Sequence, residues 1–243
     1  MPGRKNDTLL KSAFEEAFPD LLRFCFENAD DIFDTGKDFV FMDKELSELF
    51  PELENHGGNR FVDMLVNVLL KSGKEEWILV HVEIQGAGDK NFAEHMFQYW
   101  YRIYDRYKVN VTALAVFTGG KNQKRPARFY KSFLGTELSY KYNTYHIFDH
   151  SEAGLLAMDN PFALIVLAAQ KALLMGKTPE EELNRERLTV AKALINSRKY
   201  NHASMSRFLY FLKQFVYIED PKINRNFDKK VDILTRKHNT RYY

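Results

Sequence analysis

One segment restricts the fold more than any other. In residues 60–85, two apolar, β-branched runs flank a short polar turn. This pattern predicts two antiparallel strands joined by a hairpin turn around Gly73. Asp63 lies ten residues before Gly73, and Glu83 lies ten residues after it. With the turn centred on Gly73, the two carboxylates are expected to face each other across the hairpin.

Opposed carboxylates need a chemical reason, because like charges in directly opposed positions destabilise a strand pair. A bound divalent cation converts the repulsion into coordination, since such cations prefer carboxylate oxygens. Gln85 lies two residues after Glu83 and therefore on the same strand face. The sequence predicts a metal site built on Asp63 and Glu83. Removing either carboxylate is expected to preserve or raise stability in the absence of metal, because it relieves the repulsion.

The flanking segments predict an α/β arrangement. Helical spacing of apolar residues covers 7–28, with a break at Pro19, and returns at 91–108. Residues 39–42 are a short strand candidate, and the apolar run 111–117 is typical of a buried strand in a parallel sheet. Strand, helix and strand in this order predict a βαβ crossover.

The second half of the chain predicts mostly helix. Residues 140–148 alternate as a further strand would, and helical patterns follow from about residue 151, at 161–175, 179–196 and 204–217. The predicted organisation is an α/β core over 1–150 and a helical region over 151–243 with a basic tail. The tail contains Lys222, Arg225, Lys229, Lys230, Arg236, Lys237 and Arg241.

Cysteine content and hydropathy restrict the cellular setting. The single cysteine, Cys25, excludes an intrachain disulfide and a multi-cysteine zinc site. The first residues lack the apolar stretch of a secretory signal. The most apolar run, 161–175, contains Gln170 and Lys171 and is too short to span a bilayer. We expect a cytoplasmic protein without membrane contact.

Charge is unevenly distributed along the chain. Residues 1–60 hold fourteen acidic and seven basic residues, and the formal total is +2, so residues 61–243 carry about +9. A basic cluster without an acid between Thr118 and Thr136 follows the predicted buried strand; it comprises Lys121, Lys124, Arg125, Arg128 and Lys131. Ligands gather beyond strand ends in open α/β sheets, so this flexible loop is expected to hold a nucleic-acid backbone. The alternative is an ordinary solvated face.

Four short runs resemble one enzyme family: Asp7-Thr-Leu-Leu-Lys11 with Phe14, Arg60-Phe-Val-Asp63, His81-Val-Glu-Ile-Gln-Gly86 and Tyr99-Trp-Tyr-Arg102. Together with the order of helices and strands, they resemble the PD-(D/E)-x-K nuclease superfamily. The closer similarity is to its transposase-like, recombination-promoting nucleases. The similarity covers roughly residues 6–150. It implies a restriction-endonuclease-like core, a mixed central sheet flanked by helices, with a helical C-terminal lobe.

The resemblance also implies roles for matching residues. Asp63 and Glu83, helped by the backbone carbonyl of Ile84, would bind Mg²⁺ or Mn²⁺. A lysine usually occupies the position of Gln85, and glutamine can hydrogen-bond water but supplies no positive charge. Asp7 is the favoured acid of the first helix, with Glu15 or Glu16 as substitutes. Arg102 matches the family pattern and could reach a phosphate or the carboxylates of the metal site.

Each of these residues also has a purely structural interpretation. Asp63 could lie on a solvent-exposed face, Gln85 could end its strand, and Asp7 could cap a helix. His81 shares the face of Glu83 but is interpreted as structural. Arg102 could form a solvated salt bridge. The aromatic run Tyr99, Trp100, Tyr101, Tyr104 and Tyr107 has helical spacing, which favours a buried helix face over base stacking.

The sequence therefore predicts a metal-dependent DNA endonuclease. The alternative is a catalytically inactive nuclease-fold module that binds DNA or protein. The two carboxylates favour the enzyme, and the missing lysine favours the inactive module. DNA is the expected partner, and whether several copies of the chain assemble is left open.

Overall fold

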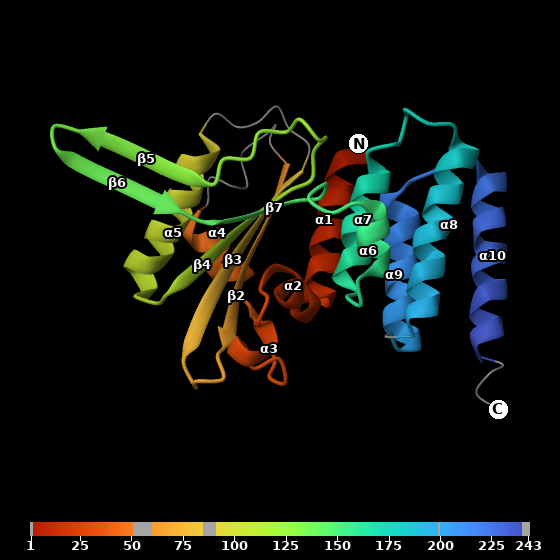
Figure 1. The fold of residues 1–243 in the computed structure, drawn as a ribbon, viewed down its shortest axis with the longest axis horizontal. Coiled ribbons are helices and arrows are strands. Elements are labelled where there is room, and N and C mark those ends of the chain that lie inside the picture. The colour runs from red at the N-terminus through yellow and green to blue at the C-terminus, as the bar shows by residue number, and fades with distance from the viewer. Residues whose placement is uncertain (1, 51–59, 85–90, 199, 240–243) are drawn as a thin grey trace. The chain divides into compact units, whose positions relative to one another are not determined.

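The computed structural model describes residues 2–50, 60–84, 91–198 and 200–239 (Figure 1). It contains a five-stranded mixed sheet flanked by helices and a C-terminal helical region. The chain divides into two compact units: a sheet unit, residues 25–146, and a helical unit that combines residues 1–24 with 147–243. Among the described residues, no helix has the length and apolar character needed to cross a membrane.

The sheet has the strand order β1-β2-β3-β4-β7. Its strands are β1 (Val40–Phe41), β2 (Arg60–Leu69), β3 (Glu75–Ile84), β4 (Val111–Phe117) and β7 (Asn143–His146). The first three run antiparallel, whereas β4 is parallel to β3 and β7 is parallel to β4. Helix α5 (Phe92–Tyr107) makes the crossover from β3 to β4 that parallel neighbours require. The predicted hairpin, crossover helix and buried strand are all confirmed.

The turn between β2 and β3 lies one residue earlier than predicted. The backbone N–H of Leu70 donates to the Lys74 carbonyl oxygen at 2.8 Å, so the loop is Lys71-Ser72-Gly73 and its centre is Ser72. Gly73 is the last loop residue and has φ of +80°, the left-handed conformation that a three-residue hairpin loop places there. Glycine adopts this conformation without steric cost. The strand register therefore differs from the predicted one.

One face of the sheet packs against α5 and α4 (Asp43–Leu49). The buried residues of α5 follow its helical period: Phe92, Met96, Tyr99 and Ile103. They pack with alternate strand residues Leu65, Leu79, Ala115 and Phe117. Of the predicted aromatic face, Tyr99 is buried, whereas Tyr101 and Tyr104 are exposed and lie outside this core. The prediction of one buried aromatic face is therefore correct only in part.

A second, two-stranded sheet follows β4. Strands β5 (Arg128–Phe133) and β6 (Thr136–Lys141) form an antiparallel hairpin, and a short helix, α3 (Ala29–Ile32), completes the sheet unit. The segment predicted as a flexible basic loop over 121–131 is therefore partly ordered strand. Arg128 and Lys131 belong to β5, whereas Lys121, Lys124 and Arg125 precede it. The predicted strand over 140–148 divides between the end of β6 and β7.

The helical unit is built from seven helices of the described chain: α1 (Pro2–Glu16), most of α2 (Phe18–Cys25), α6 (Glu152–Ala157), α7 (Phe162–Ala172), α8 (Glu180–Ser197), α9 (His202–Phe215) and α10 (Pro221–Asn239). Helix α7 is buried over ten consecutive residues. The Phe14 ring of α1 packs edge-on against Phe162 of α7 at 4.9 Å. Hydrogen bonds from Arg207 of α9 lower the pKa of the Glu16 carboxyl in α1.

These contacts explain why the observed division of the chain differs from the sequence-based one. A boundary at residue 147 is close to the predicted one at 150, but the first 24 residues group with the later helices. The amphipathic α1 buries Leu10 and Phe14, and its partners in the unit are the α7 and α9 helices. Sequence proximity to the hairpin therefore does not decide where the first helix packs.

Candidate functional site

The candidate site lies on the β2–β3 hairpin and begins with Asp63. Its side chain is only 8 % exposed, so the alternative of a solvent-exposed aspartate is wrong. Asp63 of β2 is the register partner of His81 of β3. The His81 ring is 2 % exposed, and its Nδ1 atom forms an ion pair with the Asp63 Oδ1 atom. The core of the hairpin thus contains a buried acid–imidazole pair.

The observed register corrects the predicted opposition of the two carboxylates. Asp63 lies opposite His81, and Glu83 lies opposite Phe61. The physical reason is the αL position of Gly73 at the end of the loop, which shifts the pairing by two residues. An imidazole opposite a carboxylate is favourable, so repulsion between opposed acids no longer argues for a metal.

The two-residue shift in strand register leaves Asp63 and Glu83 on the same face of the sheet. His81 is the direct partner of Asp63, and Glu83 lies two residues further along β3. Residues two apart in a strand belong to the same face, so Asp63 and Glu83 hold diagonal positions on one face. Diagonal neighbours in an antiparallel pair are roughly 7 Å apart. That spacing is compatible with two carboxylates that share one cation, given metal–oxygen distances of about 2–2.6 Å.

Several predicted ligands lie outside what the structure describes. The side chains of Asp7 and Glu83 and the whole of Gln85 are outside the described residues; Ile84 is the last residue of β3. Among the described residues, no group of three or more His, Cys, Asp or Glu side chains is arranged to hold a metal ion. The two substitutes for Asp7 have other partners: Glu15 pairs with Lys11, and Glu16 with Arg207.

Aromatic rings enclose the Asp63–His81 pair on the α5 side. The His81 ring lies 5.1 Å from the Phe92 ring and 5.9 Å from the Tyr99 ring, measured between centroids. Tyr99 in turn packs edge-on against Phe50 at 4.4 Å. A wall of this kind lowers the local polarity and strengthens electrostatic interactions inside it. His81 was interpreted as structural in the sequence, and only the hairpin register shows that it contacts Asp63.

Arg102 is held at the end of α4. Its Nη1 atom donates to the backbone carbonyl oxygen of Leu49 at 3.3 Å, and its guanidinium lies over the Phe50 ring at 4.9 Å. These contacts satisfy a carbonyl at the C-terminus of α4, where a cation is favourable. A phosphate would compete with them, and the structure does not bring Arg102 into contact with Asp63 through any described interaction.

The segment that follows β4, residues 118–131, contains the basic cluster and is called the basic segment below. It begins at the same sheet edge as Glu83. Glu83 and Phe117, the last residue of β4, are register partners in parallel strands. The chain that leaves β4 after Phe117 therefore starts beside the carboxyl end of β3, where ligands gather in open α/β sheets. Within this segment Lys121, Lys124 and Arg125 are exposed. His146, the last residue of β7, is the register partner of Phe117 on the other side of β4 and is 1 % exposed.

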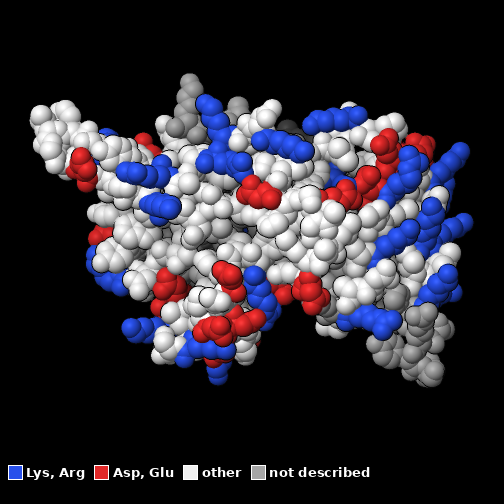
Figure 2. All heavy atoms as spheres, viewed as in Figure 1, with Lys and Arg blue, Asp and Glu red and all other residues white. Residues whose placement is uncertain are grey.

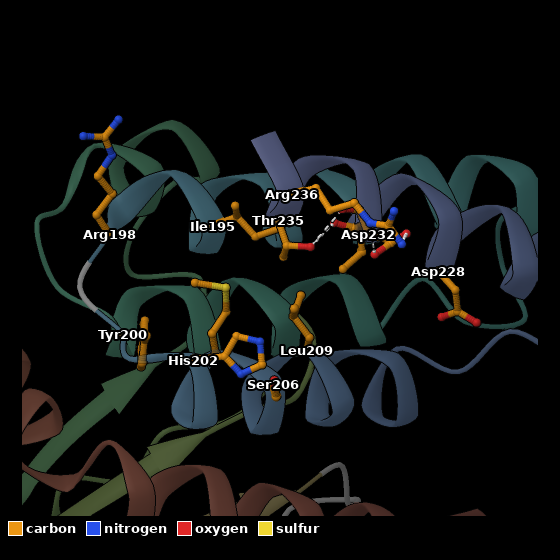
Figure 3. Close-up of a pocket in the computed structure, with 12 residues that line it drawn as sticks. Ile195, Arg198, Tyr200, His202, Ser206, Leu209, Asp228, Asp232, Thr235 and Arg236 are labelled. Atoms are coloured by element: carbon orange, nitrogen blue, oxygen red, sulfur yellow. Dashed lines mark hydrogen bonds and ion pairs between the residues drawn. The ribbon is translucent and has the colours of Figure 1, made fainter. Parts of the chain in front are cut away.

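A pocket in the helical unit is drawn in Figure 3. A pocket of about 530 Å³ lies between α8, α9 and α10. Figure 3 shows His202 and Ser206 of α9 across from Asp232, Thr235 and Arg236 of α10. Asp232 and Arg236 pair at 2.9 Å, so these two charges neutralise each other. This lining offers no excess positive charge for a nucleic acid.

Comparison with known proteins adds no assignment: no protein-family model, no curated protein and no solved structure matches the chain.

Proposed function

We propose that this protein is a metal-dependent nuclease that hydrolyses DNA phosphodiester bonds. We place it in the PD-(D/E)-x-K superfamily, with a restriction-endonuclease-like core and the transposase-like, recombination-promoting type of activity. The strand order supports this placement: three antiparallel strands, a crossover helix and a parallel strand. One observation carries the proposal. The Asp63 side chain is buried on β2, and Glu83 has the diagonal position on β3, at the edge where the basic segment begins.

The donors fit a hard divalent cation. Asp63 and Glu83 would supply carboxylate oxygens and Ile84 a backbone carbonyl oxygen, the ligands that Mg²⁺ and Mn²⁺ prefer. One Asp63 oxygen contacts His81, which leaves the other oxygen to bind a cation. Ligating carboxylates are commonly held by a second partner that orients them. His81 is therefore assigned as a positioning residue for Asp63.

The remaining residues would prepare the phosphate and the water. A cation bound here would polarise the phosphate and lower the pKa of an attacking water. Gln85 would orient that water through its amide, without the positive charge of a lysine. The exposed Lys121, Lys124 and Arg125 would hold the DNA backbone next to the site.

A second candidate is an inactive nuclease-fold module that binds DNA. The Asp63–His81 pair favours it, because the Asp63 carboxylate already has an imidazole as its partner and does not require a metal beside it. In this alternative the basic segment still binds DNA, but the hairpin has only a structural role. Metal binding distinguishes the two candidates.

Metal binding is tested by thermal unfolding with and without Mg²⁺ or Mn²⁺. A cation that binds only the folded protein should stabilise it by about 2.7 kcal/mol at a hundredfold excess over its dissociation constant. Asp63→Asn and Glu83→Gln should lose this stabilisation. Glu75→Gln, at the exposed opposite end of β3, is the matched control and should keep it. Equal metal-induced shifts in all four proteins would favour the inactive module.

DNA binding by the basic segment is tested by its salt dependence. Each lost phosphate contact lowers the slope of log affinity against log salt by about 0.9 on duplex DNA. Replacing Lys124, Arg125 and Arg128 with alanine should therefore flatten the slope by up to roughly 2.7, equally on two unrelated duplexes. The matched control replaces Arg225, Lys229 and Lys230 of α10. A change only in this control would locate DNA binding in the helical unit.

A further inference from the structure

The β5–β6 hairpin ends in two exposed apolar side chains. Phe133 is 74 % exposed and Leu134 is 89 % exposed, the highest values among the exposed large hydrophobic residues of the described chain. Phe133 pairs with Thr136, so the loop between the strands contains only Leu134 and Gly135. Figure 1 shows the hairpin extending away from α5, with this loop at its free end.

Leucine is an unfavourable residue at position 134, both for the backbone conformation of the turn and for its exposure to solvent. Both loop residues have positive φ, +45° at Leu134 and +83° at Gly135, as a two-residue turn of type I′ requires. Asparagine is favoured at the first of these positions, and leucine adopts the left-handed conformation reluctantly. A polar residue would also suit an exposed tip better. Positions that break local rules in this way are frequently functional.

The hairpin is braced at its base, so the tip is held in place. The Phe129 ring of β5 stacks on Phe97 of α5 at 5.3 Å, and the Tyr140 ring of β6 lies 5.4 Å from Trp100. The Tyr142 hydroxyl donates to the Pro126 carbonyl oxygen at 2.7 Å. Because its base is packed, the hairpin can hold the tip in a fixed position against a bound partner, which a mobile loop could not do.

The charge around the tip favours a polyanion. Residues 118–142 contain six Lys or Arg residues and one acid, Glu137. In Figure 2 the free end of the hairpin is white, one red acidic group lies next to it, and blue side chains follow further from the free end. The Arg128 guanidinium also lies over the Tyr130 ring at 4.8 Å, and Tyr130 is itself 51 % exposed. An apolar tip with cations behind it matches DNA, in which the base stack lies between two phosphate backbones.

We propose that this hairpin inserts Phe133 and Leu134 between neighbouring base pairs of duplex DNA, while the basic residues behind the tip contact phosphates. Apolar wedges of this kind partly unstack a base step and kink the duplex. The cost of unstacking is lowest where pairing is already weakened. The inference rests on the proposed function for DNA as substrate and deepens it: the preferred substrate is a duplex with a mismatched or otherwise weakened step.

The test measures base unstacking and binding separately, in EDTA so that cleavage does not occur. A duplex with 2-aminopurine beside a mismatch should become more fluorescent when the full-length protein binds, and fluorescence anisotropy reports affinity. The variant Phe133→Thr with Leu134→Asn removes the apolar tip and supplies a strand-forming residue and a favoured turn residue. It should lose the fluorescence rise and bind the mismatched duplex roughly tenfold more weakly.

The matched control, Phe133→Leu with Leu134→Met, keeps the tip apolar and should retain both signals. Loss of the fluorescence rise in this control, or its persistence in the polar variant, would overturn the wedge. So would an unchanged fluorescence accompanied by a loss of self-association or of vesicle binding in the polar variant, because the tip would then contact a second copy or a lipid surface. Asp63→Asn should retain the rise, so a failed cleavage assay alone overturns the proposed nuclease and leaves the wedge standing.

Discussion

Asp63→Asn and Glu83→Gln are each expected to abolish Mg²⁺-dependent nicking of supercoiled DNA. Each substitution removes one carboxylate of the proposed cation site while keeping the size of the side chain. Groups that stabilise charge in a transition state typically contribute 10²-fold or more, so a loss of roughly 10²-fold or more is expected. The measurement is the rate of conversion of supercoiled to nicked plasmid under metal saturation. Glu75→Gln should nick at the parental rate.

The choice of asparagine follows from the contact between Asp63 and His81. With opposed carboxylates, Asp63→Ala would preserve or raise stability by relieving repulsion, but the neighbour of Asp63 is an imidazole. Alanine would leave the buried His81 ring without this partner, and an unsatisfied buried polar group costs about 1–3 kcal/mol. Asparagine retains an acceptor for the ring. A parental nicking rate in folded Asp63→Asn would contradict the site.

Arg187→Ala is expected to lower the free energy of unfolding by about 3–5 kcal/mol, because it leaves buried acceptors without their donor, at about 1–3 kcal/mol each, and opens a cavity. Arg187 is 0 % exposed in α8, and burial lowers the pKa of its guanidinium to about 10. Its Nη atoms donate to Asn184 Oδ1, Asn224 Oδ1 and the Val216 carbonyl oxygen, at 3.0, 3.1 and 3.3 Å. The guanidinium also lies 4.2 Å from the Phe227 ring centroid. Alanine removes these donors and leaves a cavity.

Two comparisons make the Arg187 prediction specific. Arg187→Met fills part of the cavity without restoring donors, so its loss should lie between those of the parent and the alanine variant. Arg185→Ala changes an exposed neighbour in the same helix and should alter stability by less than about 0.5 kcal/mol. Urea unfolding followed by circular dichroism supplies the free energies. A loss below about 1 kcal/mol for Arg187→Ala would show that these contacts are not stabilising.

The local pattern of residues by itself determined the elements around the candidate site. The two apolar, β-branched runs within 60–85, the helical spacing of 91–108 and the apolar run 111–117 occur in the structure as β2, β3, α5 and β4. Helical spacing identifies α5 because this helix buries one face, whereas β3 and β4 are recognised as continuous apolar runs because consecutive residues of both strands are buried. The parity of Asp63 and Glu83 was also predicted, since a two-residue shift in pairing leaves each residue on its face.

Only the tertiary structure decided which side chains meet. The partner of Asp63 depends on whether Gly73 is the centre or the last residue of its loop, a difference of backbone conformation that composition does not encode. The packing of α1 with α7 and α9 joins residues more than 140 positions apart, such as Phe14 and Phe162. The basic segment after β4 pairs with a later strand to become β5, because aromatic contacts with α5 stabilise the hairpin. Local spacing selects faces, whereas loop geometry and long-range packing select partners.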